Sequence, residues 1–418
     1  MKLNIILTLL LLNTTWELRA QTSLDDYRQE VIDFSHEVHI SALNSEASKA
    51  DMRQANKGYL PALSMGAEVN LDFRETTPER PWSWLADVTL SQTIYNGGAV
   101  RATAKRRAAL YAKSEAEEQL THMDVIYSAD RAYWQLSRTE SHLRTMQEYV
   151  AVVDSLREVV KRRFEEGYSA KGDLLQIESR ISDARYQLST AEQSYRIALH
   201  AYNSLRGTEI DSPVVLQESI FDIAAMPRRQ EVNDIMQHHP QYRSTLLSVE
   251  ESAWAIKSSV ARFLPSVHLS IYGRLQPNTP HIRGHGSDIN GGAIITFSTP
   301  IFHFGERREA AQSAEVKHLQ QIALKEQVED DIELIEGDAW VNIYNARQRV
   351  DVARESLSIA EENLAMSIYS YGEGMATILD VLQAQLSWLQ ISQNAIAAYY
   401  DYAMAIAGYE YATATNIE

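Results

Sequence analysis

The sequence has no cysteine, only 10 prolines among 418 residues, and no long apolar segment beyond its N-terminus. Without cysteine the chain cannot form disulfides, use thiolate chemistry or carry an acylated N-terminal cysteine. A membrane-spanning helix needs roughly 20 consecutive apolar residues, and no segment reaches that length. Basic residues are outnumbered, 39 against 56 acidic ones, for a net charge of −17. Such a surface does not suit nucleic acid, so the composition excludes that partner.

The N-terminus is typical of an export signal. Lys2 precedes a short apolar run over 5–12, and Leu18, Arg19 and Ala20 lead to Gln21. This pattern predicts a secretory signal peptide over residues 1–20, cleaved near Ala20. We expect the exported chain to have no helical membrane anchor and to be held together by packing.

The remaining sequence is a tandem duplication. Gly98, Gly167 and Asp173 have counterparts in Gly305, Gly374 and Asp380, and the differences 305−98, 374−167 and 380−173 are each 207. Pro61 has its counterpart in Pro265, at a spacing of 204. The repeat predicts one fold built from two similar halves, repeat 1 over 21–225 and repeat 2 over 226–418.

Each repeat contains a pair of alternating segments, at about 60–96 and 264–302. In the first segment every second residue is apolar, which predicts a strand with one apolar face. Turn-forming residues separate the segments of each pair, at 75–81 in the first repeat and in a Gly/Pro/His-rich loop predicted over 277–292 in the second, so we expect two hairpins. The alternating apolar residues are Leu63, Met65, Ala67, Val69, Leu71, Phe73, Trp84, Ala86, Val88, Leu90 and Ile94, then Val267, Leu269, Ile271, Leu275, Ala293, Ile295, Phe297 and Ile301.

Two interpretations fit these strands. One is a half-buried sheet of a soluble domain; the other is a transmembrane barrel, which has apolar residues outside and polar ones inside. Aromatic residues near strand ends, where membrane interfaces lie, favour the barrel: Phe73, Trp82, Trp84, Tyr95 and Phe302. Four strands cannot close into a barrel, and an open sheet edge is not tolerated in lipid. Two chains would give eight strands and a filled interior, whereas three would give twelve and an open bore.

Long helices follow each strand pair. The segment 99–166 contains no glycine or proline and would form a helix on the order of 100 Å long. We expect a second helix over 173–206, and a repeat of the pair over 306–371, interrupted by Gly337, and 377–411. Shorter helices are expected over 24–56 and 230–262. A long charged helix is often only a coiled coil, but the absence of strict heptads favours a broad curved wall.

The chain resembles the outer membrane efflux protein family, the TolC-like outer membrane factors. The resemblance covers about 24–411 and rests on the duplicated order of these positions: Leu60, Pro61, Gly98, Gly167 and Asp173, then Leu264, Pro265, Gly305, Tyr371, Gly374 and Asp380. It implies an α+β membrane protein, a homotrimer with a 12-strand transmembrane β-barrel of four strands per chain. A long periplasmic α-helical barrel would continue it. It also implies a place in the outer-membrane lipid, a periplasmic adaptor (membrane fusion) protein and an inner-membrane RND, ABC or MFS-type pump.

The resemblance also implies site residues. Asp380, Asp173, Tyr371 and Gln383 would form a periplasmic gate or constriction, because one carboxylate per chain becomes a ring of three around the axis. The helix-tip turns would contain Gly167, Gly172, Gly372 and Gly374, and the barrel entrances Pro61, Pro265, Gly98 and Gly305. The alternative is that Thr377 and Asp380 form a capping box at a helix N-terminus. Gln383 stands where a second acid would strengthen the ring, and Ala376 where a base sometimes lies. These two residues favour a gate with a single acidic ring, or one closed mainly by packing.

We expect no catalytic residues, no cofactor and no metal. His281, His285 and His303 with Asp288, and the pair His238 and His239, match no ligand spacing. His36 and His39 lack the i, i+4 spacing of a zinc-binding helix. The sequence therefore predicts a passive outer-membrane exit duct for small toxic compounds or secreted polypeptides, with a periplasmic coiled-coil adaptor or scaffold as the alternative function.

Overall fold

The computed structural model describes residues 21–71, 82–222, 224–277 and 287–415. Their elements recur in the same order in both repeats. The first has α2 (Leu24–Phe34), α3 (His36–Asn56), β1 (Ala62–Leu71), β2 (Trp82–Asn96), α4 (Ala99–Glu165) and α5 (Lys171–Leu205). The second has α6 (Val232–His238), α7 (Pro240–Ala261), β3 (Ser266–Pro277), β4 (Ser287–Ser298), α8 (Glu306–Gly372) and α9 (Ile378–Ala412). A short 3-10 helix, η1 (Lys57–Tyr59), precedes β1.

The chain divides into two compact units, and each draws on both repeats. The helical unit contains residues up to His39, 119–238 and 332 onward; the sheet unit contains 40–118 and 239–331. None of the described helices contains a stretch apolar and long enough to cross a membrane.

The predicted long helices are confirmed, with two changes among the shorter ones. α4 and α8 each contain 67 residues, and α5 and α9 each contain 35. The predicted helix 24–56 is divided at Ser35, and the predicted helix 230–262 is divided at His239, because Pro240 begins a helix and cannot continue one. Gly337 does not interrupt α8, since one glycine costs only about 1 kcal/mol relative to alanine.

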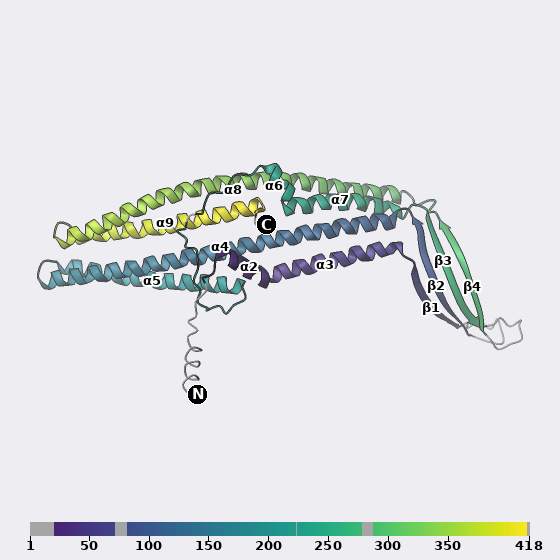
Figure 1. Ribbon diagram of the computed structural model, residues 1–418, viewed down its shortest axis with the longest axis horizontal. Helices are drawn as coiled ribbons and strands as arrows, with labels where there is room; N and C mark the ends of the chain where they lie inside the picture. Colours follow the sequence, from purple (N-terminus) through teal and green to yellow (C-terminus); the bar gives the residue numbers. More distant parts are fainter. Residues whose placement is uncertain (1–20, 72–81, 223, 278–286, 416–418) are drawn as a thin grey trace, which may run out of the picture. The chain divides into compact units, whose positions relative to one another are not determined.

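The sheet unit contains one antiparallel four-stranded sheet in the order β1-β2-β3-β4 (Figure 1). The predicted loop over 277–292 was too long, since β4 already begins at Ser287, where it pairs with Pro277. The predicted fourth strand also extended too far: β4 ends at Ser298, just before Pro300, which has no amide hydrogen for a ladder. Phe73 lies outside the described residues.

The register places apolar side chains together on one face of the sheet. Leu63 is opposite Leu90, which is opposite Ile271, which in turn is opposite Ala293. Direct partners point to the same side, so this row and the alternate rows form a continuous apolar face. Several of its side chains are more than 60% exposed: Leu63, Met65, Val69, Leu71, Ile295 and Phe297. The opposite face is polar.

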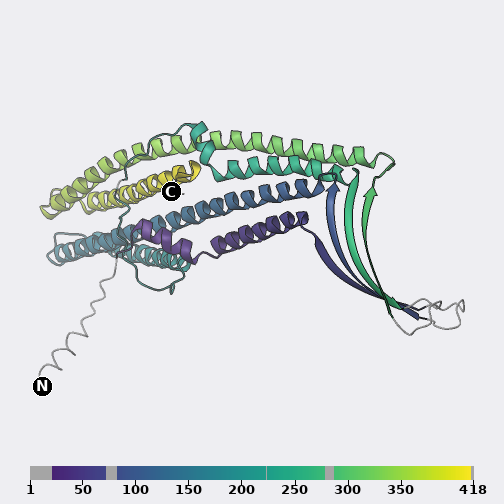
Figure 2. The ribbon, with the colours of Figure 1, turned by 45° about the vertical axis from the view of Figure 1, so that its right-hand side comes forward.

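The helical unit packs the two hairpins α4/α5 and α8/α9 together. In both views α4 and α9 lie between α5 and α8 (Figure 1 and Figure 2). Burial agrees, since α9 has sixteen buried residues and α5, of equal length, has eight. One apolar cluster contains residues of all four helices, from Met146 on α4 to Leu389 on α9.

An ion pair with a buried acid occurs in each repeat of the helical unit. Arg28 donates two hydrogen bonds to Asp130, at 2.6 and 2.8 Å, and the Asp130 side chain is fully buried. Arg229 binds Glu336 in the same bidentate way, at 3.0 and 2.9 Å, with Glu336 1% exposed. The two acids occupy nearly the same point of the two 67-residue helices, so the duplication extends to a polar contact.

Candidate functional site: the tip of the helical hairpins

The two helical hairpins turn in the same way. We define the hairpin tip as residues 163–176 and 370–383. At the end of α4 the Tyr168 amide donates to the Arg163 carbonyl at 2.7 Å; at the end of α8 the Met375 amide donates to the Ser370 carbonyl at 2.8 Å. Gly167 and Gly374 have φ values of 82° and 78°, which a glycine adopts without strain. These bonds form a Schellman motif in both turns.

The other predicted tip glycines lie inside helices. Gly172 is the second residue of α5, and Gly372 is the last residue of α8. At the predicted barrel entrances, Pro61 and Pro265 immediately precede β1 and β3. Gly98 and Gly305 immediately precede α4 and α8 with φ values of 82° and 86°. These four positions therefore mark where strands and long helices begin.

Asp380 caps α9. Its carboxylate accepts hydrogen bonds from the Thr377 amide at 2.8 Å and the Thr377 hydroxyl at 2.7 Å, and the Thr377 hydroxyl accepts from the Asp380 amide. The Thr377 hydroxyl and amide lower the pKa of Asp380, so its exposed carboxylate is charged at neutral pH. The capping box is thus present, and it leaves the charge of Asp380 at the surface.

Asp173 occupies the equivalent place on α5. Its carboxylate accepts from the Ser169 hydroxyl at 2.8 Å and the Ala170 amide at 3.2 Å. Ala170 has no hydroxyl, so Ser169 supplies the side-chain bond that Thr377 supplies in the second repeat. Asp173 is only half-exposed.

Arg163 joins the two hairpins and was not predicted as a site residue. Its guanidinium donates to the backbone carbonyls of Tyr371, at 2.5 Å, and Gly372, at 3.5 Å. It also lies over the Tyr371 ring, 5.0 Å from the centroid. A cation is favourable beside the last carbonyls of a helix, so Arg163 of α4 caps α8. The sequence shows a base in the last turn of α4 but not which helix end it contacts.

Tyr371 lies at the centre of this contact. Its side chain is 6% exposed and belongs to the apolar cluster of the four helices. Burial raises the pKa of Tyr371, and Ser169 and Arg163 oppose that shift. The structure therefore brings Tyr371 together with the turn that contains Asp173, while Asp380 caps a separate helix end.

Gln383 lies on the α5/α9 side of the tip. It lines a groove of about 470 Å³ together with Gln176, its counterpart in the first repeat. The other lining residues are Ser179, Arg180, Asp183, Leu379, Leu382 and Leu386. Val381, Leu382 and Ile378 beside it are buried and belong to the apolar cluster of the four helices, so apolar packing joins the hairpins here.

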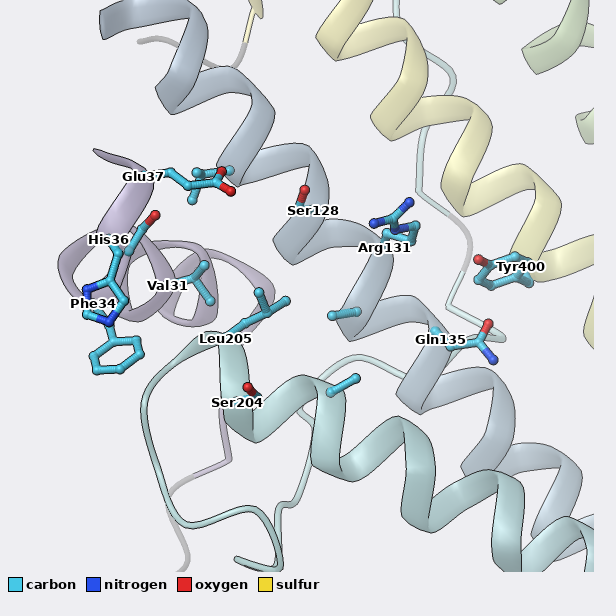
Figure 3. A pocket seen from close by; sticks show the side chains of 14 residues that line it. Val31, Phe34, His36, Glu37, Ser128, Arg131, Gln135, Ser204, Leu205 and Tyr400 are labelled. Atoms are coloured by element: carbon cyan, nitrogen blue, oxygen red, sulfur yellow. The ribbon is translucent and has the colours of Figure 1, made fainter. Parts of the chain in front are cut away.

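A second cavity in the helical unit, of about 750 Å³, lies where α2 ends and α3 begins (Figure 3). Arg131, Gln135 and Tyr400 lie toward one end of it, and Phe34 and His36 lie toward the other (Figure 3). Its polar side chains are spread along the wall and do not converge on one point, an arrangement that does not suit a catalytic site.

Part of the histidine set considered for a metal lies outside the described residues. His281, His285 and the side chain of Asp288 are not described, and the His238 Nδ1 atom lies 3.1 Å from the Asp234 carbonyl oxygen. The described residues contain no group of three or more His, Cys, Asp or Glu side chains arranged for a metal ion.

Comparison with known proteins assigns this arrangement to a family. The profile of the family described as "Outer membrane efflux protein" matches residues 18–208 and 232–408. Nodulation protein T of Rhizobium leguminosarum bv. trifolii is 24% identical over 91% of this chain and 83% of its own length. Outer membrane protein TolC of Vibrio cholerae is 22% identical over 87% of this chain and 84% of its own length.

Solved structures share the fold. The chain matches CusC with a TM-score of 0.83 at 15% identity, over 94% of this chain and 92% of that one. It matches the outer membrane protein VceC of Vibrio cholerae with a TM-score of 0.81 at 19% identity, over 93% and 95% of the two chains. With its duplicated strand pairs, its long helical hairpins and a profile match over most of its length, this chain belongs to the outer membrane efflux protein family.

Proposed function

We propose that the chain is the passive exit duct of a tripartite efflux or type I secretion system, conducting small toxic compounds or secreted polypeptides from an inner-membrane pump to the exterior. The observation that carries the proposal is the four-stranded sheet, apolar on one face and polar on the other, with β1 and β4 at its edges. A sheet of this kind is stable in lipid only when its edges are closed. Three chains would close a barrel of twelve strands.

The exposed apolar side chains of the helical unit support assembly of several copies. On α8 they recur at spacings of seven and eleven residues, as in helices that pack along their length. They are Leu334, Val341, Val352, Ile359 and Met366, each more than half exposed. On α5 a second set recurs every eleven residues: Leu175, Tyr186 and Ile197, also more than half exposed. Two different surfaces that cover each other between copies generate a closed ring when the rotation between copies closes. A homotrimer would satisfy this condition and would also close the barrel.

The protein partners are inferred from the hairpin tip. The exposed tip residues would contact a periplasmic adaptor protein, which links the duct to an inner-membrane RND, ABC or MFS-type pump. The alternative, a periplasmic coiled-coil adaptor or scaffold, would have the long helices but no use for a sheet with an exposed apolar face. Heat-modifiable trimers in outer-membrane fractions are the expected result, and a soluble periplasmic monomer would exclude the duct.

Asp380 and Asp173 are proposed as acidic rings of the gate, and two substitutions at Asp380 separate that role from capping. Asp380→Asn removes the charge but retains an oxygen that can accept from Thr377, whereas Asp380→Ala removes both. If the ring binds cations, both variants reduce the block of single-channel current by trivalent cations in planar bilayers. If only Asp380→Ala changes the current, the carboxylate acts as a helix cap and the proposal of an acidic ring at Asp380 is wrong.

Asp173 gives an independent measurement. Asp173→Ala is expected to change the single-channel conductance or its block by multivalent cations, because three carboxylates would lie close to the axis. Asp173→Asn is the matched variant, because it removes the charge but keeps an oxygen that can accept from the Ser169 hydroxyl and the Ala170 amide. Unchanged conductance and unchanged block in Asp173→Ala would remove Asp173 from the gate.

A further inference from the structure

The polar face of the sheet holds opposite charges in one row. Asp87 on β2 is opposite Arg274 on β3, with Gly66 on β1 and Asn290 on β4 completing the row. An acid and a base at directly opposed positions of an antiparallel pair ordinarily form a cross-strand ion pair. Gly66 in this row and Gly292 next to it leave space over the outer strands, and side chains of β2 and β3 occupy that space.

Asp87 lies toward β1. A Cβ atom added at Gly66 would be 2.8 Å from the Asp87 Oδ1 atom, so the carboxylate occupies the space that a larger residue at position 66 would fill. The Thr89 hydroxyl, two residues along the same strand, donates to the Asp87 carboxylate at 3.0 Å. Glu68 on β1 adds a second exposed carboxylate to this side, and it accepts a hydrogen bond from the Asn70 side-chain amide at 2.9 Å.

Arg274 is held on the other side. Its guanidinium lies over the Tyr272 ring, 5.6 Å from the centroid. Tyr272 in turn lies toward β4, because a Cβ atom added at its partner Gly292 would be 3.0 Å from the Tyr272 hydroxyl oxygen. Among the described side chains of the polar face, the acids Asp87 and Glu68 thus lie on the β1/β2 half and the base Arg274 lies on the β3/β4 half.

We propose that this face is a binding surface for small zwitterionic solutes, in which Asp87 contacts the cationic group and Arg274 the anionic group. The proposal rests on the proposed function, since it requires the polar face to line the duct. Two separated charges on one surface match a solute with separated charges, and each contact is worth about as much as a surface ion pair. Glycine at 66 and at 292 keeps the two charges available by preventing their mutual pairing.

Two penicillins of nearly equal size test the proposal in planar bilayers. Ampicillin is a zwitterion, and benzylpenicillin lacks its ammonium group and is an anion. The purified full-length protein is expected to show transient current interruptions with ampicillin and fewer with benzylpenicillin. Asp87→Asn and Arg274→Gln should each lower the ampicillin interruption frequency about threefold or more. Equal interruption by the two penicillins would overturn the proposal.

Substitutions at glycine separate the position of the charges from their presence. Gly66→Ala keeps both charges but displaces the Asp87 carboxylate toward Arg274, so it should lower the ampicillin interruptions as Asp87→Asn does. Gly273→Ala is the matched control, because a Cβ atom there has nothing within 4 Å and points to the apolar face. A wild-type response in Gly66→Ala would show that charge separation has no part in binding. If the wild-type protein forms no channels at all, the proposed function fails instead.

Discussion

Replacing Arg28 with alanine is expected to destabilise the helical unit by about 3 to 5 kcal/mol, because it leaves the buried Asp130 carboxylate without its partner. The Asp130 side chain has no exposed surface, and Arg28 donates both hydrogen bonds that compensate its burial. Arg28 itself is 21% exposed and also contacts Asp25 and Glu410. Urea unfolding of the detergent-solubilised protein, followed by far-UV circular dichroism, measures the change.

The double variant Arg28→Ala/Asp130→Ala is the control. It removes the unpaired Asp130 carboxylate together with the arginine, so it should be more stable than Arg28→Ala alone. Such a non-additive result identifies a coupled pair. If the double variant is as unstable as the sum of the two single variants, Arg28 stabilises the protein through packing and not through Asp130.

The loss of stability in Arg28→Ala should depend on pH. Burial raises the pKa of Asp130 and Arg28 opposes that shift, so the pKa rises further in Arg28→Ala. A carboxyl whose folded pKa lies above its unfolded value destabilises the fold above the folded pKa, and the penalty disappears as protonation occurs at lower pH. The difference between variant and wild type should therefore shrink as the pH falls from about 7 toward about 4. A difference that does not vary with pH would contradict an unpaired carboxylate.

The sequence was a good guide where the structure depends on neighbours along the chain. Gly167 ends a long run without glycine or proline, and Gly374 follows a run of similar length in which the only such residues are Gly337 and Gly372. Both helices end there with the same turn. Alternating residues such as Leu63 and Met65 predicted strands and their apolar face. His239 and Pro240 were visible as a pair, and the proline could have shown that the helix over 230–262 is divided.

Contacts between segments far apart in the chain could not be predicted from the sequence. Asp130 lies in the middle of a helix, and nothing in its surroundings along the chain indicates that Arg28, 102 residues away, is its partner. Arg163 lies four residues before Gly167, but nothing around it along the chain indicates which helix end it contacts. In the structure Arg163 of the first repeat contacts the carbonyls of the second, and a repeat compared only with itself does not reveal a contact between repeats.

Arg163 also gives the largest expected effect on conduction. Its guanidinium joins the last turn of α4 to the last carbonyls of α8, so Arg163→Ala should free the two hairpins to move apart. A hydrogen bond from a charged group contributes roughly 1.5 kcal/mol, and losing it would shift the balance between closed and open tips about tenfold. We expect longer or larger single-channel openings in planar bilayers under the same voltage and salt.

The neighbouring Arg162 provides the matched control, since Arg162→Ala removes the same charge from an exposed position one residue away. Arg163→Lys is the intermediate case, because lysine keeps the charge but cannot lie over the Tyr371 ring as a planar guanidinium does. The expected order of opening is Arg163→Ala, then Arg163→Lys, then Arg162→Ala close to wild type. Equal currents in Arg163→Ala and wild type would mean that apolar packing between the hairpins, from Met146 to Leu389, closes the tip without this contact.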